Sequence, residues 1–370
     1  MRKRVLLVNK FIPPDTAPTS QLIGAIGRAL EADGWDVAFA GRRSGYSTQS
    51  PSLIRRLADE AGFHCALLAG SLFSRHRPDL VIALTSPPGL IVPASLLAKI
   101  SRSRLIHWCM DLYPDVAVAL GALPAGRIEA LIRWATVRAY RTCDLVVALD
   151  DDMAERFGAA GVDSEVLAPW PPDWRGAPAE NAPDMRGAWL YSGNLGRAHD
   201  WETMLEAQAI LERSGSTLRL VIQGSGPAQR AARERASSLG LQRVEWRPPA
   251  PEGGLLKQIH EARALVASQR PETTGMLYPS KLSTLTLTET PLIWIGSPVG
   301  AIAAELRGRP DTLVAPPGDA AQVAAFLRSL PSRPRLRDLD ISRFLEKATE
   351  RRNDGLERWK RWASRESAEA

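Results

Sequence analysis

Cysteine is scarce in this chain, and a long uninterrupted hydrophobic run is missing. The three cysteines, Cys65, Cys109 and Cys143, form no C-x-x-C pair, which argues against a disulfide framework and a zinc site. The longest apolar stretch, residues 80–100, is interrupted by prolines, and the N-terminal run, residues 5–8, is too short for the core of a signal peptide. We therefore expect a cytoplasmic protein with no transmembrane segment.

Common nucleotide and metal motifs are absent as well. No G-x-G-x-x-G follows the first apolar run, and neither G-x-x-x-x-G-K-[ST] nor H-E-x-x-H occurs, which disfavours a dinucleotide cofactor, an ATPase and a zinc hydrolase. The segment Asp150-Asp151-Asp152 could suggest a metal cluster, but before a helical pattern it is typical of a capped helix start. We expect no cofactor and no metal.

Charge is moderate and evenly spread along the 370 residues. The net charge of +6 is not gathered in a basic arm, which argues against a nucleic-acid partner. A mild basic excess suits anionic small molecules or an anionic membrane surface. Peripheral contact with the inner face of a membrane therefore stays open beside a purely cytoplasmic location.

Short buried strands alternate with helical patterns through the whole chain, which predicts α/β domains with parallel, doubly wound sheets. The apolar runs are residues 5–8, 37–40, 80–84, 105–108 and 145–149, then 188–191, 218–222, 244–246, 264–267 and 292–295. A proline-rich stretch separates the two sets. We predict a first domain over 1–168, a linker over 169–186, and a second domain over 187–340. Two such domains facing each other would place a cleft at the carboxyl ends of their strands.

Two helical segments have apolar residues among many charges. Residues 341–370 are expected to form an amphipathic helix, broken or bent at Gly355, that returns to the N-terminal domain; a basic membrane-facing tail is the alternative. Residues 127–140 alternate Ile128 and Leu131 with arginines. Here the alternatives are a membrane contact and ordinary core packing with a solvated basic face, and the pattern favours core packing.

Three glycine- or proline-containing turns follow strands of the second domain, and each could bind phosphate. In residues 193–197, Gly193 and Gly196 let the backbone approach a ligand, and Arg197 can bind phosphate oxygens in a forked geometry. Gly224 lies in a second glycine turn before a helix. Ser280 and Lys281 begin a further helix, where amides and an ammonium group favour an anion. A solvated arginine, a simple helix cap and an exposed lysine are the alternatives for these turns.

Five boxes in the same order resemble glycosyltransferase family 4, and most closely a bacterial branch that assembles surface polysaccharides. The resemblance covers nearly the whole chain. Its boxes are residues 11–19 (Phe-Ile-Pro-Pro-Asp-Thr-Ala-Pro-Thr), 111–115 (Asp-Leu-Tyr-Pro-Asp), 192–196 (Ser-Gly-Asn-Leu-Gly), 270–272 (Arg-Pro-Glu) and 279–281 (Pro-Ser-Lys).

This resemblance implies the GT-B fold, with two Rossmann-like domains, and a retaining enzyme. It implies that the nucleotide-sugar donor is held by Arg197, Lys281 and the glycine turns, and that a sugar or lipid-linked sugar acceptor binds the N-terminal domain. The implied donor residues also include Asn194, Glu272 and Thr284, and the implied acceptor residues are Thr19, Ser20 and Asp115, with Asp111 as a catalytic candidate. Asp111 or Asp115 could orient the acceptor hydroxyl, although an aspartate after a strand is as often a cap.

Two departures from the family pattern concern the site. Many relatives carry two glutamates eight residues apart, and this chain has Met276 and Thr284 at those positions. A histidine of many relatives registers on Met110, with His107 nearby but out of register. Despite these departures, the resemblance implies a retaining glycosyltransferase of polysaccharide or glycolipid assembly. A sugar-nucleotide epimerase or phosphorylase of the same fold, and a catalytically silent binding or assembly partner, remain alternatives.

Overall fold

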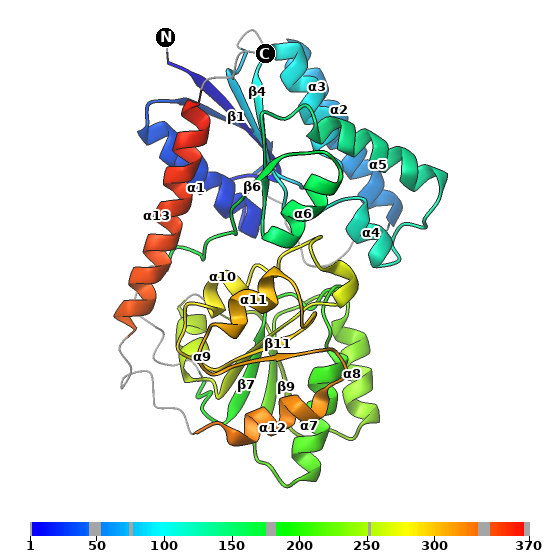
Figure 1. Ribbon diagram of the computed structural model, residues 1–370, viewed down its shortest axis with the longest axis vertical. Helices are drawn as coiled ribbons and strands as arrows, with labels where there is room; N and C mark the ends of the chain where they lie inside the picture. The colour runs from blue at the N-terminus through cyan, green and yellow to red at the C-terminus, as the bar shows by residue number, and fades with distance from the viewer. Residues whose placement is uncertain are drawn as a thin grey trace. The chain divides into compact units, whose positions relative to one another are not determined.

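The computed structural model describes residues 2–43, 53–73, 77–174, 183–250, 253–331 and 341–365. The chain divides into two compact units (Figure 1). The first unit is Met1–Trp170, Gly275–Tyr278 and Arg352–Ala370, and the second is Pro171–Thr274 and Pro279–Arg351. The middle of the expected linker, residues 175–182, and the expected end of the second domain at residue 340 lie outside the described residues.

The first unit is built on one six-stranded parallel sheet with the order β2-β1-β3-β4-β5-β6. Its strands are β1 (Arg4–Phe11), β2 (Asp36–Arg42), β3 (Leu80–Ala83), β4 (Arg104–Trp108), β5 (Leu145–Ala148) and β6 (Ser164–Val166). Its helices are α1 (Pro18–Ala32), α2 (Leu53–Phe73), α3 (Ile91–Ser101), α4 (Asp115–Ala119), α5 (Arg127–Tyr140) and α6 (Asp151–Ala159). All four residues of β3 are buried, as expected for a strand covered on both faces.

The strand order of the first sheet reverses at β1 and β3, because the chain goes from β1 outward to β2 and then returns to β3 on the other side. Open α/β sheets bind ligands at such a switch point, outside the carboxyl ends of the two strands. The Lys10 N–H near the end of β1 donates to the Ser86 carbonyl at 2.6 Å, which ties the end of β1 to the loop after β3.

The second unit contains another six-stranded parallel sheet, with the order β12-β11-β10-β7-β8-β9. Its strands are β7 (Ala188–Ser192), β8 (Arg219–Gln223), β9 (Val244–Arg247), β10 (Ala264–Ser268), β11 (Leu292–Ile295) and β12 (Thr312–Ala315). Its helices are α7 (Glu202–Arg213), α8 (Gln229–Ser238), α9 (Gly254–Glu261), α10 (Leu282–Leu285), α11 (Ala301–Arg307) and α12 (Ala320–Ser329), with a 3-10 turn η1 (Pro271–Thr273). This is the strand order of a Rossmann domain, and its switch point lies between β7 and β10.

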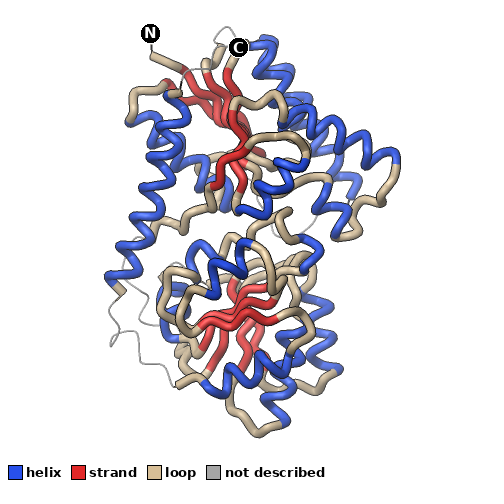
Figure 2. The backbone as a smooth tube through the Cα atoms, viewed as in Figure 1, coloured by secondary structure: helices blue, strands red, loops and turns tan. Residues whose placement is uncertain are grey.

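In each unit the strands form a central layer with helices packed over both faces, as Figure 2 shows. The core of the second unit joins aromatic residues of β7, such as Trp189 and Tyr191, to the apolar sides of α7 and α12. The two sheets confirm the predicted α/β class with doubly wound domains. Among the described helices, none combines the length and apolar character that crossing a membrane requires.

A tryptophan cluster holds the end of α13 (Ser342–Ser364) in the first unit. The Trp108 ring lies 5.2 Å from Trp170 and 5.5 Å from Trp359, measured between ring centres, and Trp359 lies 5.2 Å from Trp362. Both tryptophans of α13 are buried. The expected break at Gly355 is wrong, because the helix runs through it; a Cβ there would lie 2.6 Å from the Trp170 ring, so glycine provides room for that ring.

Helix α5 contradicts the core-packing interpretation of its apolar residues. Ile128 and Leu131 are exposed, and the helix instead buries the side made by Thr136, Ala139 and Tyr140. The prediction that the apolar face of this helix packs on the core is therefore wrong, because the buried face consists mainly of small and polar residues.

Candidate functional site

Two glycine turns interlock at the carboxyl ends of β7 and β8. The Gly193 N–H donates to the Gln223 carbonyl at 2.8 Å, and the Leu195 N–H donates to the Ser225 carbonyl at 2.6 Å. A Cβ on Gly224 would lie 2.2 Å from the Gly193 carbonyl oxygen, which leaves no room for any side chain. Gly193 and Gly224 also have positive φ angles of 133° and 136°. The structure thus brings together two of the three predicted turns.

Asn194 and Gly196 form the outer part of this turn. A Cβ on Gly226 would lie only 2.3 Å from the Asn194 Oδ1 atom. The second glycine turn therefore packs directly against the Asn194 side chain. Within the described residues, no partner accepts from the backbone N–H of Asn194, Gly196 or Arg197. Three neighbouring amide donors are therefore available to a ligand oxygen.

Lys281 reaches the same place from the turn after β10. Its Cε and Nζ atoms lie 3.3 and 3.4 Å from the position that a Cβ on Gly193 would take. Its ammonium group is buried and has no hydrogen-bond partner in the described part of the chain. Burial holds the pKa of Lys281 well below the usual 10.5. A buried amine with no counter-charge is costly, which marks this position as one that a ligand would complete.

Tyr191 and His199 form the surroundings of Lys281, and sequence reasoning did not select either of them. The Lys281 Nζ atom lies 3.3 Å from the centre of the Tyr191 ring, and the Tyr191 hydroxyl donates to the Asn194 carbonyl at 2.9 Å. Burial, and then the charge of Lys281, lower the pKa of His199 to about 3. His199 is therefore neutral, and its Nδ1 lies 2.8 Å from the Ser268 carbonyl. Both residues could have been selected from the sequence, because they lie directly before and after the glycine turn.

The other predicted donor residues lie around this centre without a direct bond to Lys281. Arg197 is exposed and makes no ion pair with any described residue, while its carbonyl accepts from Arg270 Nε at 3.1 Å. Arg270 also pairs with Glu202 at 2.8 Å, which fixes the loop after β10 beside the loop after β7. Glu272 is exposed in η1, Ser280 is exposed, and Thr284 is buried in α10.

The helix expected after Lys281 is present but short. Helix α10 has only four residues, followed by turns up to Thr290. The Ser283 hydroxyl donates to the Ser280 carbonyl and the Thr286 hydroxyl to the Leu282 carbonyl, both at 2.7 Å. Such side-chain bonds compete with a continuing helix. A helix dipole therefore adds little at this position, and the ammonium group itself is the main positive charge.

The predicted acceptor residues near β1 lie at the switch point of the first sheet. The Asn9 side chain donates to the Thr19 hydroxyl at 3.1 Å and to the Phe11 carbonyl at 2.7 Å. Ser20 is completely buried in α1, and its hydroxyl has no partner among the described residues. Thr19 is thus held by a fixed contact, while Ser20 faces the interior.

Asp111 and Asp115 have different surroundings although they belong to one sequence box. Burial raises the pKa of Asp111 to about 6, and its carboxylate makes no ion pair or hydrogen bond with a described residue. Its backbone forms an isolated bridge to Leu277 in the same unit. Asp115 instead pairs with Arg133 of α5, which also binds Glu129. The predicted acceptor role is therefore chemically open to Asp111, whereas the carboxylate of Asp115 is already engaged.

His107 does not replace the family histidine. It is buried in β4, its ring centre lies 5.4 Å from that of Tyr140, and burial lowers its pKa to about 4. Within the described residues, no group of three or more His, Cys, Asp or Glu side chains could hold a metal ion.

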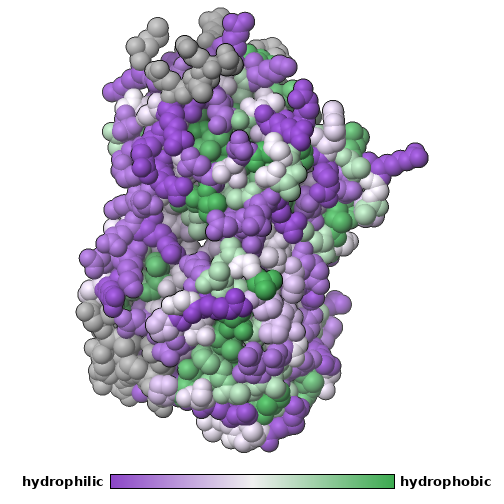
Figure 3. Space-filling model, in the orientation of Figure 1, coloured by the Kyte–Doolittle hydropathy of each residue, from purple (hydrophilic) through white to green (hydrophobic). Residues whose placement is uncertain are grey.

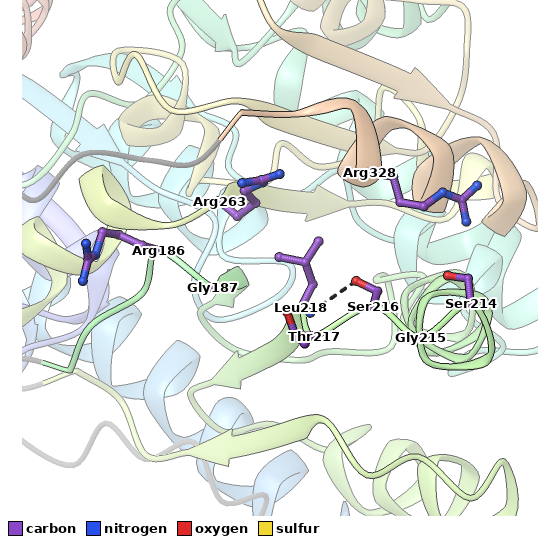
Figure 4. Close-up of a pocket in the computed structure, with 9 residues that line it drawn as sticks. All are labelled: Arg186, Gly187, Ser214, Gly215, Ser216, Thr217, Leu218, Arg263 and Arg328. Atoms are coloured by element: carbon purple, nitrogen blue, oxygen red, sulfur yellow. Dashed lines mark hydrogen bonds between the residues drawn. The ribbon is translucent and has the colours of Figure 1, made fainter.

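A separate pocket of about 850 Å³ lies at the amino ends of the strands of the second sheet, opposite the glycine turns (Figure 4). Its residues precede β7, β8 and β10 or end α12, so they mark the amino ends of the strands: Arg186, Gly187, Ser214, Gly215, Ser216, Thr217, Leu218, Arg263 and Arg328. Arg186 pairs with Asp184, and Arg263 donates to the Leu330 carbonyl. These cations are engaged locally, and the pocket is distinct from the glycine turns.

Comparison with known proteins supports the fold. No protein-family model matches the chain. An Escherichia coli K12 protein named "Putative colanic acid biosynthesis glycosyl transferase WcaI" is 23% identical over 259 residues, covering 65% of this chain and 63% of that protein. The match thus spans less than two thirds of the curated relative.

Solved structures resemble the chain over almost its full length. Sucrose-phosphate synthase from Thermosynechococcus elongatus has a TM-score of 0.64 and 15% identity, covering 97% of this chain and 94% of its own. Anabaena HepE in complex with UDP and glucose has a TM-score of 0.62 and 13% identity, covering 97% and 98%. These likenesses, with the two six-stranded parallel sheets, show that the chain has the GT-B fold of two Rossmann-like domains.

Proposed function

We propose that this chain is a glycosyltransferase that transfers a sugar, with retention, from a nucleotide-sugar donor to an acceptor hydroxyl in polysaccharide or glycolipid assembly. The observation that carries the proposal is the buried, partnerless ammonium of Lys281 against two interlocked glycine turns. Their place at the switch point of a Rossmann sheet is where such domains bind nucleotides.

The chemistry of this centre favours a diphosphate. An isolated buried ammonium destabilises the folded chain, so an anion that neutralises it gains affinity from the same charge. Glycines let phosphate oxygens approach the free amides of Asn194, Gly196 and Arg197. The exposed guanidinium of Arg197 can add a forked contact without first breaking an ion pair.

The names of similar proteins agree with such a ligand. Anabaena HepE was solved with UDP, with UDP and glucose, and with UDP-glucose. The similar Escherichia coli protein is named as a glycosyl transferase of colanic acid biosynthesis. A uridine-containing nucleotide-sugar is therefore the first donor to test, and a growing glycan or glycolipid is the first acceptor class.

In the proposed reaction, Lys281 and Arg197 stabilise the negative charge that develops on the departing diphosphate. Tyr191 positions the Lys281 amine, and the neutral His199 offers a hydrogen-bonding nitrogen beside the turn. Asp111 of the first unit is the proposed residue for orienting the acceptor hydroxyl, because its carboxylate is not engaged by a cation. The proposal includes no metal ion, and membership in glycosyltransferase family 4 remains a prediction.

An epimerase is a second candidate because the fold also resembles that of a Listeria monocytogenes protein named as a "putative UDP-N-acetylglucosamine 2-epimerase", with a TM-score of 0.58 and 12% identity. Product analysis with and without acceptor separates the two functions. An epimerase converts the nucleotide-sugar alone, whereas a transferase releases nucleoside diphosphate in step with sugar added to the acceptor.

The proposal is tested by incubating the protein with UDP-glucose and a bacterial glycolipid extract, then measuring released UDP and the anomeric form of the product by NMR. We expect acceptor-dependent UDP release with retained configuration. Lys281→Met should abolish it, and Lys3→Met, which removes an exposed lysine, should not. Equal release from both variants would contradict the assignment of Lys281.

A further inference from the structure

Helix α5 exposes four large apolar side chains to solvent, of which Ile132 is the least exposed at 38%. The exposed fraction is 72% for Ile128, 64% for Leu131 and 63% for Trp134. Most large apolar residues of this chain are buried, and a soluble protein seldom exposes several of them together without a partner. Figure 3 shows hydrophobic and hydrophilic side chains side by side at the edge of the first unit where α5 lies in Figure 1.

The same side of the helix carries positive charge. Arg127 and Arg138 are exposed, and the positions 127, 131, 134 and 138 follow the helical spacing of one stripe. We call the residues Arg127, Ile128, Leu131, Trp134 and Arg138 the α5 face. The acidic residue of this helix, Glu129, is bound to Arg133 and lies away from the stripe.

Neighbouring segments extend this chemistry. Helix α3 packs against α5 and exposes Leu96 and Ile100 with the basic Lys99 between them in sequence. The loop that leads into α5, residues 121–126, contains no charged side chain, and most of it is exposed. Apolar groups and cations, without a facing carboxylate on the stripe, therefore continue beyond one helix.

We propose that the α5 face binds an anionic lipid surface, with the helix lying in the plane of the headgroups. Apolar side chains would enter the boundary of the acyl chains, Trp134 would sit at the headgroup level, and the two arginines would contact lipid phosphates. Charge complementarity selects this partner, because the stripe offers only positive charge to the surface that covers it. This inference goes beyond the proposed transfer reaction and does not depend on it.

The test is co-sedimentation of the full chain with vesicles of phosphatidylcholine alone or with about 30% phosphatidylglycerol, which makes the vesicle surface anionic. We expect binding to the anionic vesicles that weakens at high salt. The variant Ile128→Ser/Leu131→Ser/Trp134→Ser should bind at least about tenfold more weakly, and Arg127→Gln/Arg138→Gln should lose a similar factor. All these side chains are exposed, so the variants should fold, which thermal unfolding checks.

Matched controls lie in the second unit. Val299→Ser removes another apolar side chain that is 70% exposed, and Arg230→Gln removes another exposed arginine. Both should bind vesicles as the wild type does. The proposal is overturned if the wild type ignores anionic vesicles, if the α5 variants bind as well as the controls, or if the wild type forms a dimer that the α5 substitutions dissociate, since the face would then bind a second copy.

Discussion

The Lys281 ammonium lies 3.3 Å from the centre of the Tyr191 ring and has no hydrogen-bond partner among the described residues. The ring offers the negative face of its π-system, which compensates part of the desolvation of the amine. It cannot replace a counter-ion. The pair therefore holds a cation in place at the glycine turns and leaves most of its charge for a ligand.

Replacing Lys281 should make the unliganded protein more stable. Lys281→Met keeps most of the side-chain volume and removes the buried amine, so we expect an increase of about 1–3 kcal/mol in the free energy of unfolding at pH 7. The folded-state pKa is lowered below the unfolded value, so the penalty in the wild type shrinks as the pH rises toward 10.5. Chemical denaturation at pH 7 and pH 10 measures both effects. A less stable variant would mean that the amine is paired in solution.

Nucleotide affinity should fall as the pH rises. The free-state pKa of Lys281 is lowered by burial, and a bound diphosphate favours the protonated amine and raises that pKa. Between the two pKa values binding takes up a proton, so the dissociation constant rises by about tenfold per pH unit. Calorimetry of UDP binding in buffers with different ionisation enthalpies reports this uptake. Proton release, or no linkage at all in the wild type, would argue against charge on Lys281 in the complex.

The close contact of the two glycine turns predicts a selective effect of alanine. Gly224→Ala places a Cβ 2.2 Å from the Gly193 carbonyl oxygen and should weaken UDP binding by at least about tenfold, with a stability loss of about 3 kcal/mol or more. Gly215→Ala is the matched control, because its φ is +76° but no atom lies within 4 Å of the new Cβ. It should cost only about 1 kcal/mol and leave binding intact. Similar losses in both variants would show that backbone strain, and not the contact, matters.

Asp111 and Asp115 should respond to removal of their charge with opposite signs. Because the folded pKa of Asp111 is raised to about 6, its ionisation lowers stability as the pH rises through the range from about 4 to 6. Asp111→Asn should therefore stabilise the chain at pH 7 by about 2 kcal/mol, with little change at pH 4, while it lowers turnover. Asp115→Asn loses the pair with Arg133 and should cost about 1 kcal/mol. Thermal unfolding of both variants at pH 4 and pH 7 distinguishes the two effects. If Asp115→Asn were more stable than the wild type, the ion pair of Asp115 with Arg133 would not stabilise the chain.

Most strands with continuous apolar runs could be predicted from the sequence because both of their faces are buried, as in β3 and β11. The edge strands β2 and β9 were also predicted, although β2 is largely exposed and β9 is half-buried. The edge strands β6 and β12 were missed: β6 is three half-buried residues with one apolar side chain, and the apolar run of β12 is only the three residues Leu313-Val314-Ala315. The short α10 follows from hydroxyl groups that bond backward to carbonyls, which a helical pattern does not reveal.

The glycine turns of the site could be predicted from the sequence, but the burial and pairing of its charged side chains could not. Glycine turns after strands identified Gly193 and Gly224, because these positions need a backbone without Cβ. Nothing in the residue order near Lys281 indicates that its amine is buried on Tyr191, since the two residues meet only through the adjacency of β7 and β10. Likewise, the pairing of Asp115 with Arg133 depends on how α4 meets α5.

Titration of UDP into the wild type, Lys281→Met and Lys3→Met by calorimetry at pH 7 tests whether the buried amine of Lys281 binds the diphosphate. We expect measurable binding to the wild type and to Lys3→Met. For Lys281→Met we expect affinity to fall by at least about hundredfold, with cooperative unfolding confirming that the variant is folded. Equal affinity of all three proteins for UDP, or no binding of any nucleoside diphosphate by the wild type, would contradict this role of Lys281.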